Sequence, residues 1–181
     1  MKQYIGIIRG INVGGHNKVN MKLLREALEE KKYQNVRTYI QSGNLVFRSR
    51  VQSISKIESV LSGVLKKTFD VDVPVLVRDE VEWKRTVSRN PFLKKTDDLT
   101  KLLVTFLSVK PAVADLKATR EIHFPNDDFV IDGKDIYMWC RNGYGKTDIP
   151  NAFFEKKLKV TGTTRNWRTV LELEKMLELK A

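Results

Sequence analysis

At 181 residues with 41% hydrophobic and 30% charged side chains, the chain has the composition of one large domain or two small ones, which excludes a disordered polypeptide. No apolar run approaches the roughly 18 to 20 residues that cross a bilayer, and no signal-peptide pattern is present, so we expect a cytoplasmic protein with no membrane partner. The formal charge of +11 predicts attraction to anions, while one cysteine and two histidines exclude an internal disulfide and a zinc cluster, so we expect no metal and no cofactor.

The first part of the chain predicts the element order β-α-β-β-α-β. Residues that alternate every second position mark strands, and apolar residues three and four positions apart mark helices. The expected elements are a strand over 3–11, a helix over 21–32 capped by Asn20, a hairpin of strands 36–41 and 45–48, a helix that follows Ser53, and a strand over 71–78. This order is the ferredoxin-like arrangement, with both helices on one face of an antiparallel sheet, and we assign it to a subdomain over residues 1–78.

The second part predicts a similar but less regular subdomain. A helical connector over 79–98 comes first, opened by Asp79 and Glu82 at capping-box spacing. Residues 99–181 then predict a strand over 102–109, a helix over 112–118, a hairpin of 129–131 with 136–140, and helices near 151–158 and 167–179. The fold class is therefore α+β, with two ferredoxin-like subdomains and antiparallel sheets, the second ending in a helix where a clear last strand is missing.

A glycine-rich loop with cations and amides follows the first strand and is the best candidate site. Its candidate ligand residues are Arg9, Asn12, Gly14, Gly15, Asn17 and Lys18. Backbone N–H groups of such a loop can point at an anion, and the helix that follows adds partial positive charge at its N-terminus. The phosphate-binding P-loop pattern fails, because His16 and Asn17 stand where the lysine and the hydroxyl belong.

Three shorter segments carry further candidates. Gln41, Ser42 and Asn44 surround a glycine in the hairpin turn, either as ligands or as a turn held by local hydrogen bonds. A loop before the helix near 151 presents Lys146 to an anion.

The third segment lies near the end of the chain and includes Arg165 and Asn166. Here Thr163 or Thr164 is expected to cap the last helix, which places Arg165 in its first turn, where a cation opposes the helix dipole. That placement indicates either a partner carboxylate or a bound anion.

The positive charge is concentrated at the two ends of the chain. Residues 1–50 hold ten Lys/Arg against three Asp/Glu, residues 141–181 hold nine against five, and the segment between them is balanced. If the ends meet, they form one basic surface; the alternative is that these lysines only solvate helix faces. Weak, sequence-independent nucleic-acid binding is the expected side effect.

Three strings of residues together resemble the bacterial domain-of-unknown-function family 1697. They lie at 9–15, 37–47 and 162–170. The resemblance spans essentially the whole chain and implies an α+β fold with ferredoxin-like subdomains, without implying a biochemical role. The chain departs from the family pattern at Lys32, where a glycine is usual after the first helix, and at Thr147, where a serine is common.

The sequence thus predicts a soluble anion- or phosphate-binding module whose three polar strings meet in one cleft. The partner is a small anionic ligand, and no oligomeric state is predicted. One alternative is a transferase or hydrolase acting on a phosphorylated small molecule or nucleotide, with His16 as acid or base and Lys18 or Lys146 stabilising charge. Another is a non-catalytic nucleic-acid or protein-interaction protein whose motifs only preserve turns.

Overall fold

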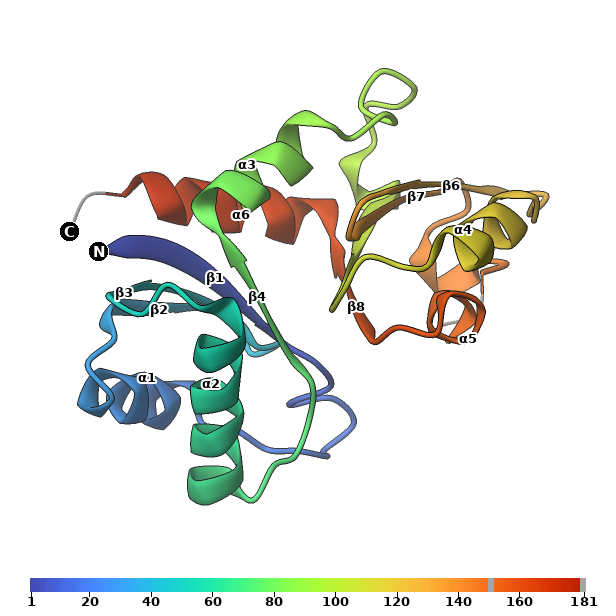
Figure 1. Cartoon of the computed structure of the whole chain (residues 1–181). Helices are drawn as coiled ribbons and strands as arrows, with labels where there is room; N and C mark the ends of the chain where they lie inside the picture. The colour runs from blue at the N-terminus through green and yellow to red at the C-terminus, as the bar shows by residue number, and fades with distance from the viewer. Residues whose placement is uncertain (150–151, 180–181) are drawn as a thin grey trace. The chain divides into compact units, whose positions relative to one another are not determined.

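The structure is a computed structural model that describes residues 1–149 and 152–179 (Figure 1). The chain forms two compact units, one of Met1–Arg85 with Glu172–Ala181 and the other of Thr86–Leu171. Each unit contains one four-stranded antiparallel sheet, so the protein is α+β as predicted. Within the described residues, no helix combines the length and apolar character needed to cross a bilayer.

The first unit follows the predicted element order. Its elements are β1 (Lys2–Ile8), α1 (Met21–Glu30), β2 (Gln34–Tyr39), β3 (Asn44–Ser49), α2 (Ile54–Phe69) and β4 (Val75–Asp79). The strands lie in the order β2-β3-β1-β4, and α1 and α2 cover one face of the sheet (Figure 1). Tyr4, Phe47 and Val77 from the sheet pack in one buried cluster with Leu24 and Leu61 from the helices. Each such side chain contributes about 1.5–3 kcal/mol on burial.

The helix ends of this unit follow from local chemistry. The Asn20 side chain accepts from the N–H groups of Lys22 and Leu23, and Ser53 accepts from Lys56, as the sequence predicts for the two caps. Lys32, with φ of 67°, takes the left-handed conformation just beyond α1. A glycine adopts that conformation without the steric cost of a Cβ atom.

The second unit contains another sheet with its own core. The elements from the connector onward are α3 (Glu80–Ser88), η1 (Leu99–Lys101), β5 (Leu102–Leu107), α4 (Val113–Arg120), β6 (Asp127–Asp132), β7 (Asp135–Cys140), η2 (Tyr144–Lys146), α5 (Phe153–Leu158), β8 (Gly162–Asn166) and α6 (Trp167–Glu178). The strand order is β6-β7-β5-β8. Leu103, Met138 and Cys140 from the sheet share a buried cluster with Phe154 and Leu158 of α5.

The sequence prediction for the end of this unit was wrong in two respects. A last strand does exist, because β8 pairs antiparallel with β5 from Gly162 to Asn166. Arg165 therefore lies in a strand and not in the first turn of the last helix. The cap of α6 is Asn166, whose side-chain oxygen accepts from the N–H of Thr169 at 2.8 Å, and not one of the preceding threonines.

The two units repeat each other in detail. At the end of the first strand of each unit, Ile8 N–H donates to the Gly43 carbonyl at 2.7 Å, and Leu107 N–H donates to the Lys134 carbonyl at 2.8 Å. Both acceptors lie in the hairpin turn of their own unit. The resemblance between the halves therefore extends beyond element order to equivalent hydrogen bonds.

The last strand of each unit carries an arginine at an equivalent position. Arg78 of β4 and Arg165 of β8 each donate to the carbonyl of the preceding residue, at 3.1 and 2.9 Å. Each arginine is followed by a residue whose side chain caps the next helix. The Asp79 side chain accepts from Glu82 N–H at 2.8 Å, and the Asn166 side chain accepts from Thr169 N–H at 2.8 Å. Glu82 also accepts from Asp79 N–H, so the predicted capping box is confirmed.

Candidate functional site

One end of the first sheet brings two of the predicted strings together. The loop of residues 9–20 leaves β1 at this end, and the turn of residues 40–43 joins β2 to β3 here, because β1 and β3 are antiparallel with Ile7 opposite Asn44. The Asn12 side-chain amide donates to the Gln41 carbonyl at 2.9 Å. We call the loop and the turn together the β1-end site.

The loop owes its shape to an unusual run of left-handed residues. Positive φ angles between 48° and 80° occur at Gly10, Asn12, Gly14, Gly15 and Asn17. Glycine and asparagine tolerate this conformation better than other residues. The sequence therefore uses its glycines and asparagines where the backbone needs them.

Both loop asparagines also hold the loop with their side chains. Asn12 accepts from Val19 N–H at 2.8 Å and donates to the Val19 carbonyl at 3.0 Å. Asn17 donates to the Gly10 carbonyl at 3.0 Å. These two predicted ligand residues thus position the loop, so any contact with an anion would fall to the cations beside them.

The tip of the loop is a tight turn. His16 N–H donates to the Val13 carbonyl at 3.0 Å, and the two glycines between them both have positive φ, as in a type I′ turn. Val13 remains 63% exposed. The tip therefore carries the apolar Val13 and the His16 imidazole on two residues that pair across the turn.

The hairpin turn of the site is strained. Ile40 has φ of 50° and is 53% exposed, although a β-branched residue rarely adopts the left-handed conformation. Such a residue costs about 1–2 kcal/mol and persists only where neighbouring structure imposes it, which is common at functional sites. Asn44 is fully buried and donates to the Tyr39 carbonyl and to Ser42 Oγ, so these predicted ligand residues hold the turn in place.

The loop and turn of the β1-end site carry positive formal charges and no negative one. Arg9 is half-buried, whereas His16 and Lys18 are exposed. Residues 1–25 contain no Asp or Glu to offset them. The Asn20 side chain accepts from the Lys22 and Leu23 amides in the first turn of α1, so these two amides are not available to a ligand. The helix still contributes the positive end of its dipole to the site.

The predicted loop around Lys146 lies in the second unit and already holds a carboxylate. The buried Asp127 accepts from Thr147 Oγ1 at 2.7 Å and from Asp148 N–H at 2.6 Å. Lys146 ends the short helix η2, well before α5 begins. The carboxylate of Asp127 thus already accepts hydrogen bonds from the residues that follow Lys146.

Arg165 and Asn166 also belong to the second unit. The Arg165 guanidinium donates to Thr163 Oγ1 at 3.0 Å, and burial lowers its pKa to about 10. Asn166 is occupied as the cap of α6. That Lys146, Arg165 and Asn166 share one cleft with the β1-end site stays a prediction.

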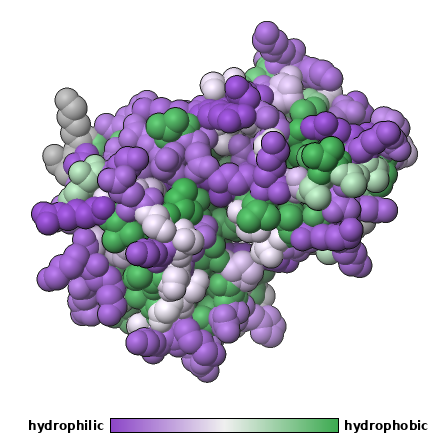
Figure 2. All heavy atoms as spheres, viewed as in Figure 1, coloured by the Kyte–Doolittle hydropathy of each residue, from purple (hydrophilic) through white to green (hydrophobic). Residues whose placement is uncertain are grey.

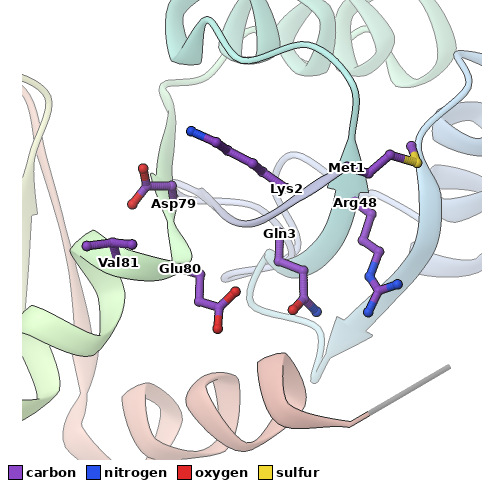
Figure 3. A pocket seen from close by; sticks show the side chains of 7 residues that line it. All are labelled: Met1, Lys2, Gln3, Arg48, Asp79, Glu80 and Val81. Carbon is purple, nitrogen blue, oxygen red and sulfur yellow. The ribbon is translucent and has the colours of Figure 1, made fainter.

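Sequence reasoning missed a pocket of about 390 Å³ beside the opposite end of β1 (Figure 3). Gln3, Arg48 and Glu80 extend into the same space, while Lys2 points to the other side. The Arg48 Nε atom is buried without a hydrogen-bond partner. Both charge signs line this pocket and its residues come from separate segments, so no sequence motif marks it and it suits an anion less well than the β1-end site.

Neither a metal centre nor a reactive thiol is present in the part of the chain that the structure describes. No cluster of three His, Cys, Asp or Glu side chains is placed there to hold a metal ion. Cys140 is a buried packing residue of the second sheet, and burial raises the pKa of its thiol to about 11. The thiolate is the reactive form, so this cysteine is chemically quiet at neutral pH.

Comparison with known proteins places the chain in a family and supports the fold. The model of the family described as "Protein of unknown function (DUF1697)" matches residues 1–137, and the chain belongs to this family. A solved structure, that of the conserved bacterial protein SP0830 from Streptococcus pneumoniae, matches with a TM-score of 0.77 and 23% identity over 97% of this chain and 98% of that one. Among curated proteins, none matches the sequence significantly.

Proposed function

We propose that the protein is an anion-binding module and that the β1-end site takes a small ligand with a phosphate or similar oxyanion. Arg9 and Lys18 would contact the anion, and the left-handed turn at Gly14 and Gly15 would present backbone N–H groups to it. Turns with such geometry form anion-binding concavities in other proteins.

The observation that carries the proposal is the strained, preorganised frame beneath these cations. Left-handed backbone at Asn12, and at Ile40 next to the hydrogen-bond partner Gln41, costs free energy. A site that is already rigid loses less conformational entropy when it binds a ligand, so a preorganised loop favours higher affinity. The exposed side chains of Val13 and Ile40 favour a ligand that also has an apolar part.

The binding function is favoured over catalysis by the surroundings of His16. A catalytic histidine is usually oriented by a carboxylate or carbonyl and lies within hydrogen-bond reach of the group it serves. Among the described residues, no side chain forms a hydrogen bond with the His16 imidazole. For the transferase or hydrolase hypothesis to hold, the substrate itself would have to orient the His16 imidazole.

We propose further that both units are variants of the ferredoxin-like fold. The support is that each unit orders its strands as second, third, first, fourth, with one helix after its first strand and one after its third. We also propose a cytoplasmic location. The charge of +11 would add a weak, salt-sensitive attraction to nucleic acids.

Calorimetric titration with pyrophosphate tests the function. We expect Lys18→Ala to weaken the affinity about tenfold through the loss of one charge-assisted contact. Lys117→Ala is the matched control, because it removes one exposed lysine from α4 of the second unit. Equal losses in both variants, or no pyrophosphate binding to the wild type, would contradict the proposed site.

A further inference from the structure

A groove runs between α1 and α2 and continues past the end of α1 toward the edge strand β2. It consists of two adjoining cavities of about 370 and 520 Å³, which share Lys31 and Val60 in their walls. In the space-filling view, green and white surface lies among purple atoms over the region where Figure 1 places these helices (Figure 2).

The floor of the groove is apolar. Ala27, Val60 and Val64 line the part between the helices, and Val51, which is 42% exposed, lines the part beyond α1. Gly63 lies in the middle of α2, and a Cβ atom added there would meet no heavy atom within 4 Å. A glycine inside a helix is unfavourable, and this one keeps the groove open.

The rim of the groove is basic. Lys31, Lys32, Arg50 and Lys67 line it, against the single carboxylate of Glu30. None of these four cations forms an ion pair with another residue of the described chain. Lys32 is in the left-handed conformation, which is energetically unfavourable for a residue with a side chain. A lysine at this position therefore adds a rim cation at a cost in backbone energy.

We propose that this groove docks an acidic amphipathic helix of a partner protein. Such a helix lays apolar side chains three and four residues apart into a hydrophobic groove, and its carboxylates would meet the four cations of the rim. A nucleic acid would also be attracted by the cations of the rim, but binding of single strands relies in addition on exposed aromatic side chains on which the bases stack. The aromatic residue of the groove, Tyr33, is only 5% exposed.

The groove is independent of the proposed anion site. It adjoins the C-terminal end of α1, whereas the β1-end site adjoins the N-terminal end of this ten-residue helix. At 1.5 Å per residue, the two ends are about 15 Å apart. The two sites can therefore be tested by separate variants.

The test uses fluorescence anisotropy with a labelled synthetic helix of about 16 residues, with leucines at helical spacing on one face and glutamates elsewhere, at about 150 mM salt. Gly63→Leu fills the groove with a good helix former, and we expect the affinity to fall at least about tenfold. Lys32→Gly removes a rim cation while it relieves the backbone, so we expect a fall of about threefold or more without any loss of thermal stability. Lys117→Ala, the control in the second unit, should bind as the wild type does.

Two further probes decide what the groove recognises. A second peptide keeps the glutamates but has serines in place of the leucines, and we expect it to bind at least about tenfold more weakly. A single-stranded oligonucleotide of the same net charge should also bind more weakly than the first peptide. Equal binding of the serine peptide, tighter binding of the oligonucleotide, no binding of the first peptide, or unchanged affinity in a folded Gly63→Leu variant would each overturn the proposal.

Discussion

Replacing Asn12 by glycine should lower the free energy of unfolding by about 2 kcal/mol. The side chain makes three hydrogen bonds with the backbone, two with Val19 and one with the carbonyl of Gln41, and a longer one to Met21 Sδ at 3.9 Å that we leave out of the sum. Each such bond contributes about 1 kcal/mol, and the loss is felt because Val19 is buried. Glycine recovers up to about 1 kcal/mol by relaxing the left-handed backbone, which leaves a net loss of about 2 kcal/mol.

Asn17→Gly is the matched control for this variant. Asn17 has nearly the same backbone conformation, with φ of 48° against 55° for Asn12, but its side chain makes one exposed hydrogen bond, to the Gly10 carbonyl. The lost bond and the relieved strain are each about 1 kcal/mol, so we expect almost no net change. The difference between the two variants therefore isolates the hydrogen bonds of Asn12.

Urea denaturation followed by circular dichroism measures the two free energies, and amide exchange reports on the loop itself. The Val19 amide should lose protection in Asn12→Gly and keep it in Asn17→Gly, because the Asn12 side-chain oxygen is its acceptor. Equal destabilisation by both variants, or unchanged protection of Val19 in Asn12→Gly, would refute the assignment of Asn12 as the residue that holds the loop.

Four other variants test further features of the chain. Gly43→Ala should lower the free energy of unfolding by about 2–4 kcal/mol in urea denaturation, because its Cβ would lie 2.8 Å from the Ile8 carbonyl oxygen, whereas Gly10→Ala, with open space, should cost only about 1 kcal/mol. Ile40→Gly should raise the melting temperature, since it relieves a left-handed residue that is largely exposed; a lower value would refute the strain. The pKa of Cys140 is raised from 9.0 to about 11 in the folded protein, so its contribution to stability is present below pH 9.0 and is lost as the pH rises toward about 11. Cys140→Ala should therefore make the free energy of unfolding depend less on pH between these values. An unchanged pH dependence would contradict the raised pKa.

The elements that the sequence predicts correctly are those with local signals. Asn20 and Ser53 cap helices through side chains next to the amides they satisfy, and period-two alternation marks the hairpin. The first strand ends at Ile8 and not at residue 11, because the left-handed Gly10 breaks the pairing. The strand Gly162–Asn166 escaped prediction because its pairing with β5 is a long-range contact and its polar composition shows no strand pattern.

The loop and the turn of the candidate site were predictable in position, but the contacts that their residues make were not. Glycines and cations after the first strand mark the loop, and the turn that follows β2 marks its neighbour. That Asn12 and Asn44 bind backbone carbonyls, and therefore hold the site in shape, depends on contacts with residues distant in the sequence or across a turn. The pocket beside Arg48 and the groove beside Gly63 were missed for a similar reason, since their walls come from several segments with no shared motif.

The measurement that tests the central claim most directly is an NMR titration of the protein with pyrophosphate. The account predicts saturable amide shifts centred on Gly14, Gly15 and Lys18, with smaller shifts in the turn at residues 40–43. The midpoint of these shifts should move to about tenfold higher pyrophosphate in Lys18→Ala and stay unchanged in Lys117→Ala. Shifts that do not saturate and are spread over the exposed lysines of both units would contradict the claim, because they would show that the charge of +11 attracts the anion without a built site.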